Sequence, residues 1–138
     1  MNKQPLIVSD IRIKAYEVDA MGIVSNIVYI KWFEDLRHLM LDRFYPYQDM
    51  MKEGKSPILI KTEVEYKKPL TIMDEPVGRL WFSLKGRSRW EIHFEICVDN
   101  IVYCTGKQSG YYYDMLRRKP TAFPEWFINK FKEENSII

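Results

Sequence analysis

Residues 16 to 33 decide the fold, and they read Tyr-Glu-Val-Asp-Ala-Met-Gly-Ile-Val-Ser-Asn-Ile-Val-Tyr-Ile-Lys-Trp-Phe. An acidic residue, Asp19, stands in a tight turn with Gly22, and this turn opens directly into an apolar helix that begins around Asn26. The first backbone N–H groups of a helix have no partner within it, and such donors can polarise a carbonyl group. A carboxylate beside them is suited to acyl transfer, as a base or as a nucleophile.

The helix predicted after this turn runs from about residue 26 to residue 45. Its apolar residues recur at steps of three and four, without Pro or Gly between them: Ile27, Ile30, Phe33, Leu36, Met40 and Phe44. The polar residues form only a narrow stripe, made of Lys31, Glu34, Asp35, His38 and Asp42. A helix that is apolar over most of its circumference is enclosed by its surroundings. We therefore expect a sheet to wrap around it.

Alternating apolar and polar residues predict strands before and after the helix in the sequence. One strand precedes it, over residues 9–16, and four follow a loop at 46–57, over residues 58–67, 77–85, 90–98 and 101–113. Asp99-Asn100 predicts a tight turn, and Gly106 and Gly110 predict bending or close backbone approach. A short helix is predicted after Pro124. The order indicates an α+β fold, an antiparallel sheet of about five strands wrapped around one long helix.

The length and composition are those of one ordinary globular domain, residues 1–138. The chain is 46% apolar and 29% charged, and its net charge of +2 is too near zero to predict binding to nucleic acid. The first residues, MNKQPLIVSD, contain no apolar stretch of the length expected of a signal peptide, and no apolar run approaches the ~18 residues that a membrane span needs. We therefore expect a cytoplasmic protein without membrane insertion. Cys97 and Cys104 lie in strand-like sequence and are expected to be reduced and buried.

The turn and the helix also carry a family resemblance. The pattern is Tyr16-x-x-Asp19-x-x-Gly22-Ile23-Val24-x-Asn26-x-x-Tyr29, followed by Trp32-Phe33-Glu34-x-x-Arg37. It resembles the opening of hotdog-fold acyl-CoA thioesterases of the 4-hydroxybenzoyl-CoA thioesterase type. The Glu65-Tyr66-x-x-Pro69 stretch and the Pro124-Glu125 pair extend the resemblance over nearly the whole chain.

The resemblance implies a sheet wrapped around the helix, and a homodimer or homotetramer whose sheets pair edge to edge and whose active sites lie at the dimer interface. It implies that Asp19 is the catalytic carboxylate and that the backbone N–H of Asn26 polarises the thioester carbonyl of an acyl-CoA. Gly22 belongs to the catalytic turn, and Val24 and Tyr29 of the motif are candidate substrate-binding residues. We expect no cofactor and no metal ion.

The central residues of the motif also have plain structural interpretations. Asp19 could be an Asx-turn residue that ties the end of a strand to the loop, and Gly22 could be a turn glycine with positive φ. Asn26 could be the N-cap of the helix, with its side chain accepting from a backbone N–H. The chemistry of Asp19 is open as well, because it could attack the carbonyl to form a mixed anhydride or deprotonate a water.

Several charged residues outside the turn have a possible role in binding or catalysis. The basic residues around Gly86, which are Lys85, Arg87 and Arg89, could bind the phosphates of coenzyme A or form a solvated hairpin tip. Lys67 and Lys68 are weaker candidates for the same role. Glu34 is expected to be structural, paired at helical spacing with Arg37 or Lys31. The two histidines, His38 and His93, lie among charged neighbours and are not expected to be catalysts.

Two further functions remain open at this point. Residues 24–30 are also similar to acyl-ACP thioesterases of the fatty-acid type, but those carry Asn and His where this chain has Met21 and Ile23, which argues against their mechanism here. A non-catalytic protein that binds acyl thioesters could use the same fold.

Overall fold

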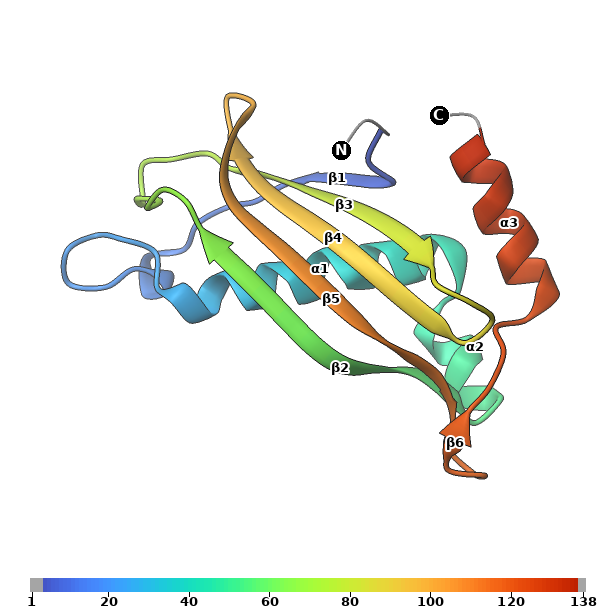
Figure 1. Cartoon of the computed structure of the whole chain (residues 1–138). Coiled ribbons are helices and arrows are strands. Elements are labelled where there is room, and N and C mark those ends of the chain that lie inside the picture. Colours follow the sequence, from blue (N-terminus) through green and yellow to red (C-terminus); the bar gives the residue numbers. More distant parts are fainter. Residues whose placement is uncertain (1–3, 137–138) are drawn as a thin grey trace.

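A computed structural model describes residues 4–136 of the chain (Figure 1). Its strands are β1 (Ile7–Asp10), β2 (Lys55–Tyr66), β3 (Val77–Leu84), β4 (Arg89–Val98), β5 (Ile101–Asp114) and β6 (Lys119–Pro120). Its helices are α1 (Asn26–Phe44), α2 (Tyr47–Lys52) and α3 (Glu125–Ser136), and a 3-10 turn covers Ala15–Glu17. The long helix and the four strands after it lie close to their predicted ranges.

The strands form one antiparallel sheet in the order β1-β3-β4-β5-β2, and β6 pairs with β5. The sheet curves around α1, which lies across one of its faces (Figure 1). Alternate residues of β4 turn toward this helix and are buried, namely Trp90, Ile92, Phe94 and Ile96. The predicted α+β arrangement of one long helix enclosed by an antiparallel sheet is thus confirmed.

The centre of the core is a direct contact between α1 and the middle of the sheet. The rings of Phe33 and Phe94 stack with centroids 4.5 Å apart, and both side chains are buried. Gly106 on β5 makes room for this pair, because a Cβ atom there would lie only 2.4 Å from the Phe33 ring. The close approach predicted for Gly106 is confirmed, and a larger residue would push α1 away from the sheet.

Residues 46–57, predicted as a loop, contain α2 and the first residues of β2. Pro46 precedes α2, and the N–H groups of Asp49 and Met50 donate to its carbonyl oxygen at 2.9 and 3.3 Å. The Met50 side chain turns into the core and is 1% exposed. The prediction of a loop was wrong because a helix this short shows no clear period in its sequence.

The bounds predicted for the first strand, residues 9–16, were also wrong. The strand β1 ends at Asp10, and the chain then turns out of the sheet before α1 begins. The carboxylate of Glu17 closes this turn, because it accepts from the backbone N–H of Lys14 at 2.8 Å and is buried. The apolar alternation at Ile11 and Ile13 therefore belongs to an extended segment rather than to a strand.

One edge of the sheet is long and open. Among the described residues, the 12-residue strand β2 has a single neighbour in the sheet order, β5, so its other edge is open. A bulge between Leu59 and Lys61 interrupts the ladder, and Ile60 at this bulge is 63% exposed. An open edge with exposed apolar residues is a natural place for another strand to pair.

Two further sequence predictions can be compared with the structure. Cys97 and Cys104 are free and buried, as predicted. Burial raises the pKa of the Cys104 thiol to about 12, so this group remains protonated at neutral pH. Within residues 4–136, none of the helices has the length and apolar character required to cross a membrane.

Candidate active site

The turn before α1 is a compact loop closed by backbone hydrogen bonds. Val18 and Val24 form an antiparallel bridge at its base, and the Asp19 N–H donates to the Ile23 carbonyl at 2.9 Å. Gly22 has φ of 77°, and its N–H donates to the Asp19 carbonyl at 2.9 Å. A Cβ at Gly22 would meet nothing within 4 Å, so glycine is required for the backbone conformation and not for space.

The carboxylate of Asp19 is held by this loop. Its Oδ1 atom accepts from the backbone N–H groups of Met21 at 2.9 Å and Ile23 at 3.1 Å, which is the arrangement of an Asx turn. The side chain is exposed to solvent, and in the described part of the chain no hydrogen bond reaches Oδ2. One oxygen therefore fixes the orientation of the group while the other can meet a water or a substrate.

The helix α1 begins directly after this loop. Ser25 occupies the N-cap position without a side-chain cap bond, so the interpretation of Asn26 as the N-cap was wrong: Asn26 is the first helical residue. Its N–H has no partner within the helix and lies at the positive end of the helix dipole. Its carbonyl oxygen accepts from the hydroxyl of Tyr66 at 2.8 Å, which ties the start of α1 to the end of β2.

A surface hollow lies at this junction. Three residues of the motif line it, Val24, Asn26 and Tyr29, together with Ile23, Tyr66, Lys67, Lys68 and Pro69. Asp19 does not line the hollow, but its backbone bond to Ile23 connects it to the rim. The hollow thus joins the start of α1 to two lysines. The Lys67 ammonium pairs with Glu65 at 3.2 Å, and the Lys68 ammonium lies over the Tyr103 ring, 5.7 Å from its centroid.

Tyr29 supports this hollow from inside the core. It is 2% exposed, and its ring meets those of Trp32 and Tyr66 edge to face with centroids 5.2 and 5.1 Å away. Burial raises the pKa of Tyr29 to about 12, so its phenol is neutral at physiological pH. The neutral phenol packs between α1 and β2.

The basic residues around Gly86, predicted to bind phosphates, lie away from this hollow. Lys85, Arg87 and Arg89 surround the β3–β4 turn, and the Phe123 N–H donates to the Arg87 carbonyl at 2.9 Å just before α3. In Figure 1 this turn is at the end of the sheet near α2 and α3, away from the start of α1. The Arg87 guanidinium faces Glu125 at 3.4 Å, and the Lys85 ammonium lies 3.9 Å from Glu91. Within one chain, the basic residues beside the hollow are instead Lys67 and Lys68. The sequence predicts them only as weaker candidates for binding phosphates.

The other charged candidates pair with neighbours. Glu34 and Arg37 form an ion pair of 2.8 Å one helical turn apart, as predicted for a structural pair. His38 lies 3.6 Å from Asp42 on the exposed side of α1. His93 contacts Glu91 at 2.9 Å on β4.

The curved antiparallel sheet around one long helix defines a class of proteins, those with the hotdog fold. A thioesterase from Thermus thermophilus, solved in complex with coenzyme A and Zn, has the same arrangement with a TM-score of 0.83. The match covers 99% of this chain and 98% of that one at 18% sequence identity. The predicted hotdog fold is confirmed.

The chain belongs to the Thioesterase-like superfamily, whose family model matches residues 13–131. A provisionally named esterase of Aquifex aeolicus (strain VF5) is 34% identical over 123 residues, which are 88% of this chain and 94% of that protein. A provisionally named acyl-CoA thioesterase of Bacillus subtilis (strain 168), YneP, is 33% identical over 75 residues, 54% of each chain. By family, this protein is a thioester hydrolase.

Proposed function

We propose that this protein hydrolyses acyl-CoA to the free acid and coenzyme A, with Asp19 as the catalytic carboxylate and the Asn26 N–H as the oxyanion donor. The observation that carries the proposal is the fixed, exposed carboxylate of Asp19 in the loop that leads directly into the start of α1. The hollow beside Asn26 supports the proposal, because a thioester bound there would lie next to the start of α1.

Two routes of hydrolysis use the same groups. As a general base, Asp19 takes a proton from water while the water oxygen attacks the thioester carbonyl. As a nucleophile, it forms a mixed anhydride that water then cleaves. In both routes the carbonyl oxygen becomes negative and is stabilised by the helix N–H, and the C–S bond breaks to release the thiolate of coenzyme A. A thiolate is a good leaving group, so the site needs no strong acid.

Coenzyme A is the proposed carrier because the hollow places two lysines beside the helix start. Lys67 and Lys68 lie next to Asn26, and a phosphate there would compete with Glu65 for the Lys67 ammonium. The Thermus neighbour bears coenzyme A, and YneP is named for acyl-CoA. Membership of the 4-hydroxybenzoyl-CoA branch and a cytoplasmic location remain predictions from the sequence.

We also propose that two copies pair through β2. The open edge of this strand is long, carries exposed Ile60, and ends at Tyr66 beside Asn26. Antiparallel pairing of two such edges would extend the sheet across both copies and place the hollow near the interface.

The replacement Asp19→Asn tests the function. The amide oxygen of Asn can still accept from Met21 and Ile23, so the fold should be kept while the base is lost. We expect kcat/KM for acyl-CoA hydrolysis to fall by about 10²–10⁴-fold, measured as thiol release. Asp42→Asn, an exposed carboxylate at the far end of α1, is the matched control and should retain activity.

Different outcomes would replace the proposal with an alternative. Near-normal hydrolysis by Asp19→Asn would remove Asp19 from the mechanism. Faster hydrolysis of matched acyl-ACP than of acyl-CoA would assign the other carrier. Tight binding of acyl-CoA without thiol release would leave a binding protein.

A further inference from the structure

The turn between β5 and β6 projects beyond the sheet and carries apolar side chains. It covers residues 115–118 and extends past the start of β2, at the bottom of the view in Figure 1. Leu116 is 84% exposed and Met115 is 52% exposed. Single exposed apolar residues are common on protein surfaces, but here two adjacent ones stand together on a projecting turn.

Hydrogen bonds hold the backbone of this turn in place. The carboxylate of Asp114 accepts from the N–H groups of Leu116 and Arg117, both at 3.0 Å. The Arg118 N–H donates to the Asp114 carbonyl at 2.8 Å and closes the turn. The turn thus presents Leu116 to solvent in a fixed position.

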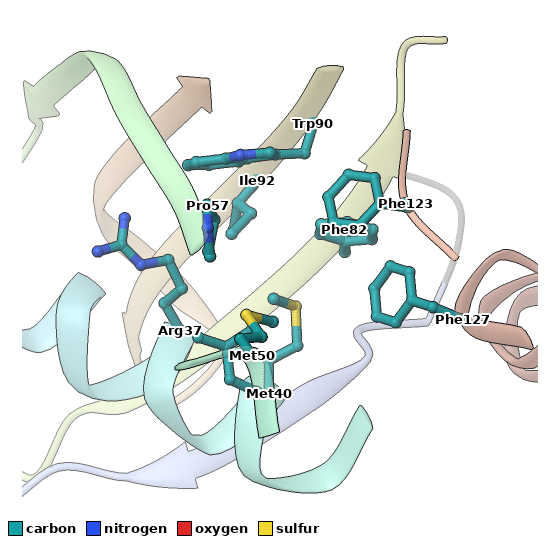
Figure 2. Close-up of a pocket in the computed structure, with 10 residues that line it drawn as sticks. Arg37, Met40, Met50, Pro57, Phe82, Trp90, Ile92, Phe123 and Phe127 are labelled. Carbon is teal, nitrogen blue, oxygen red and sulfur yellow. The ribbon is translucent and has the colours of Figure 1, made fainter. Parts of the chain in front are cut away.

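The end of α2 adds a third apolar side chain to this surface. The Met115 N–H donates to the Gly54 carbonyl at 2.8 Å, and the Gly54 N–H donates to the Met51 carbonyl at 3.0 Å. A Cβ atom at Gly54 would lie 3.4 Å from the Leu116 side chain, so this side chain packs against the end of the α2 turn. Met50 faces the small apolar cavity inside the fold (Figure 2), whereas Met51 beside it is 62% exposed. We call Met51, Met115 and Leu116 the apolar tip.

The segments that carry the apolar tip are rich in positive charge. Residues 47–55 and 114–119 contain three acidic residues and five basic ones, namely Lys52, Lys55, Arg117, Arg118 and Lys119. Two of the carboxylates are occupied locally, because Asp114 accepts from its own turn and Glu53 accepts from the Tyr45 hydroxyl. Within residues 4–136, no ion pair joins Lys52, Arg118 or Lys119 to a carboxylate. The apolar tip is therefore set in a cationic surface.

This combination matches the surface of an anionic lipid bilayer. Basic residues near such a surface are attracted to the headgroups, and apolar side chains that enter it leave water. A negatively charged protein or nucleic acid would attract the same cations but would offer no apolar phase to Leu116. The exposed apolar side chains therefore favour lipid over these partners.

We propose that this protein docks reversibly on anionic lipid membranes through the apolar tip and the basic residues around it. The docking is peripheral, so it agrees with the expected absence of membrane insertion. It does not depend on the proposed hydrolysis, because the tip lies at the start of β2 and the hydrogen bond between Tyr66 and Asn26 lies at its other end.

The first test measures co-sedimentation of the protein with lipid vesicles. Vesicles of equal parts phosphatidylcholine and phosphatidylglycerol are compared with vesicles of phosphatidylcholine alone. We expect the protein to bind only the anionic vesicles, with an affinity that falls as salt is added. Absence of binding to the anionic vesicles, or equal binding to both kinds, would overturn the proposal.

Two triple variants distinguish the basic residues of the tip from net charge. Replacement of the three basic residues at 117–119 by Gln should weaken binding to anionic vesicles about 10- to 100-fold, because each cation near such a surface contributes several-fold. Replacement of the three basic residues at 85–89 by Gln removes the same charge from a turn whose cations already face Glu91 and Glu125. The second variant should bind nearly as the native protein does. Equal losses in the two variants would contradict the proposal.

The contribution of the apolar tip is measured with Leu116→Ser. We expect this variant to bind anionic vesicles about five- to tenfold more weakly, because a leucine side chain no longer enters the bilayer. Met73→Ser is the matched control, since Met73 is also 84% exposed but lies in the loop between β2 and β3. Native affinity in Leu116→Ser would leave charge as the sole attraction and would exclude insertion of the tip.

A label at position 116 locates the tip in the bilayer. Cys97 and Cys104 are buried, and burial raises the pKa of both thiols, so a polarity-sensitive thiol dye reacts first with the exposed thiol of Leu116→Cys. We expect the emission of this label to shift to the blue on anionic vesicles, and the label on Met73→Cys to show no shift. Vesicle binding without a shift at position 116 would sink the proposed orientation.

The oligomeric state distinguishes a lipid surface from a second copy of the chain as the partner of the tip. Light scattering after gel filtration should give the same mass for the native protein and for Leu116→Ser. A lower mass for Leu116→Ser would assign the apolar tip to an interface between copies and would overturn docking on membranes.

Discussion

The two ends of α1 are built in opposite ways. At its start, Asp19 is exposed and is held by backbone N–H groups from its own loop. At its far end, Trp90 is buried in a cavity formed by several helices and strands, with its N–H unpaired. The first arrangement fixes a charged group where a reaction can reach it. The second leaves one donor unpaired in apolar surroundings and out of contact with solvent.

The largest expected effect on stability comes from a substitution in the middle of α1, between these two ends. Phe33→Ala removes the ring that stacks on Phe94 in the middle of α1, and we expect the free energy of unfolding to fall by about 3–5 kcal/mol. Ile27→Ala, at a residue 71% exposed, should change it by less than about 0.5 kcal/mol. Denaturant titration of both variants measures the difference. Equal losses would mean that the contact between α1 and the sheet does not hold the fold.

Gly22→Ala tests whether the conformation of the Asp19 loop matters for hydrolysis. Its φ of 77° disfavours any residue with a Cβ, and we expect a cost of about 1–2 kcal/mol and a fall of roughly tenfold in kcat/KM as Asp19 is displaced. Gly54→Ala, at φ of 69° before β2, should cost similar stability without the loss of rate. Thermal unfolding and thiol release on both variants check this. A rate loss shared by the two would deny the loop a specific role.

Tyr66→Phe, which also acts at the start of α1, should have a smaller effect on stability and on the rate of hydrolysis. It removes the hydroxyl that donates to the Asn26 carbonyl, so we expect about 0.5–1.5 kcal/mol less stability and a reduction in kcat/KM of less than about tenfold. Comparison of chemical denaturation with steady-state kinetics measures both. An inactive but stable Tyr66→Phe variant would assign this hydroxyl to the chemistry itself.

The smallest effect is expected from the charged surface residues. Lys67→Gln with Lys68→Gln should raise KM for acyl-CoA a few-fold and weaken its salt dependence, because phosphate binding by lysine is screened by salt. The matched replacement of Lys85, Arg87 and Arg89 by Gln decides the role of the β3–β4 turn. If only that triple variant raises KM, the phosphates bind at the turn, as first predicted from the sequence.

Much of this structure could be predicted because its signals are local. The length of α1 follows from its apolar period, and the β4–β5 turn from Asp99-Asn100, whose φ values of 51° and 65° are those such residues tolerate. The loop around Asp19 is likewise a short pattern of side chains and a required Gly22. Residues close in sequence determine each of these features.

The features that could not be predicted depend on distant contacts. The sheet order places β1 beside β3 and β2 beside β5, which no local pattern specifies. The cavity is lined by residues of six elements, α1, α2, β2, β3, β4 and α3, and the absence of a partner for the Trp90 N–H depends on all of them. Lys67 and Lys68 lie beside the start of α1 because Tyr66, at the end of β2, contacts Asn26, which is 40 residues away in the sequence.

One measurement tests the central claim most directly: kcat/KM for acyl-CoA hydrolysis by Asp19→Asn and by its control Asp42→Asn. We predict that Asp19→Asn lowers kcat/KM by about 10²–10⁴-fold, while Asp42→Asn, at an exposed position near the far end of α1, keeps it near the native value. If Asp19→Asn hydrolyses acyl-CoA at a near-native rate, or if the two variants lose activity equally, the account is contradicted.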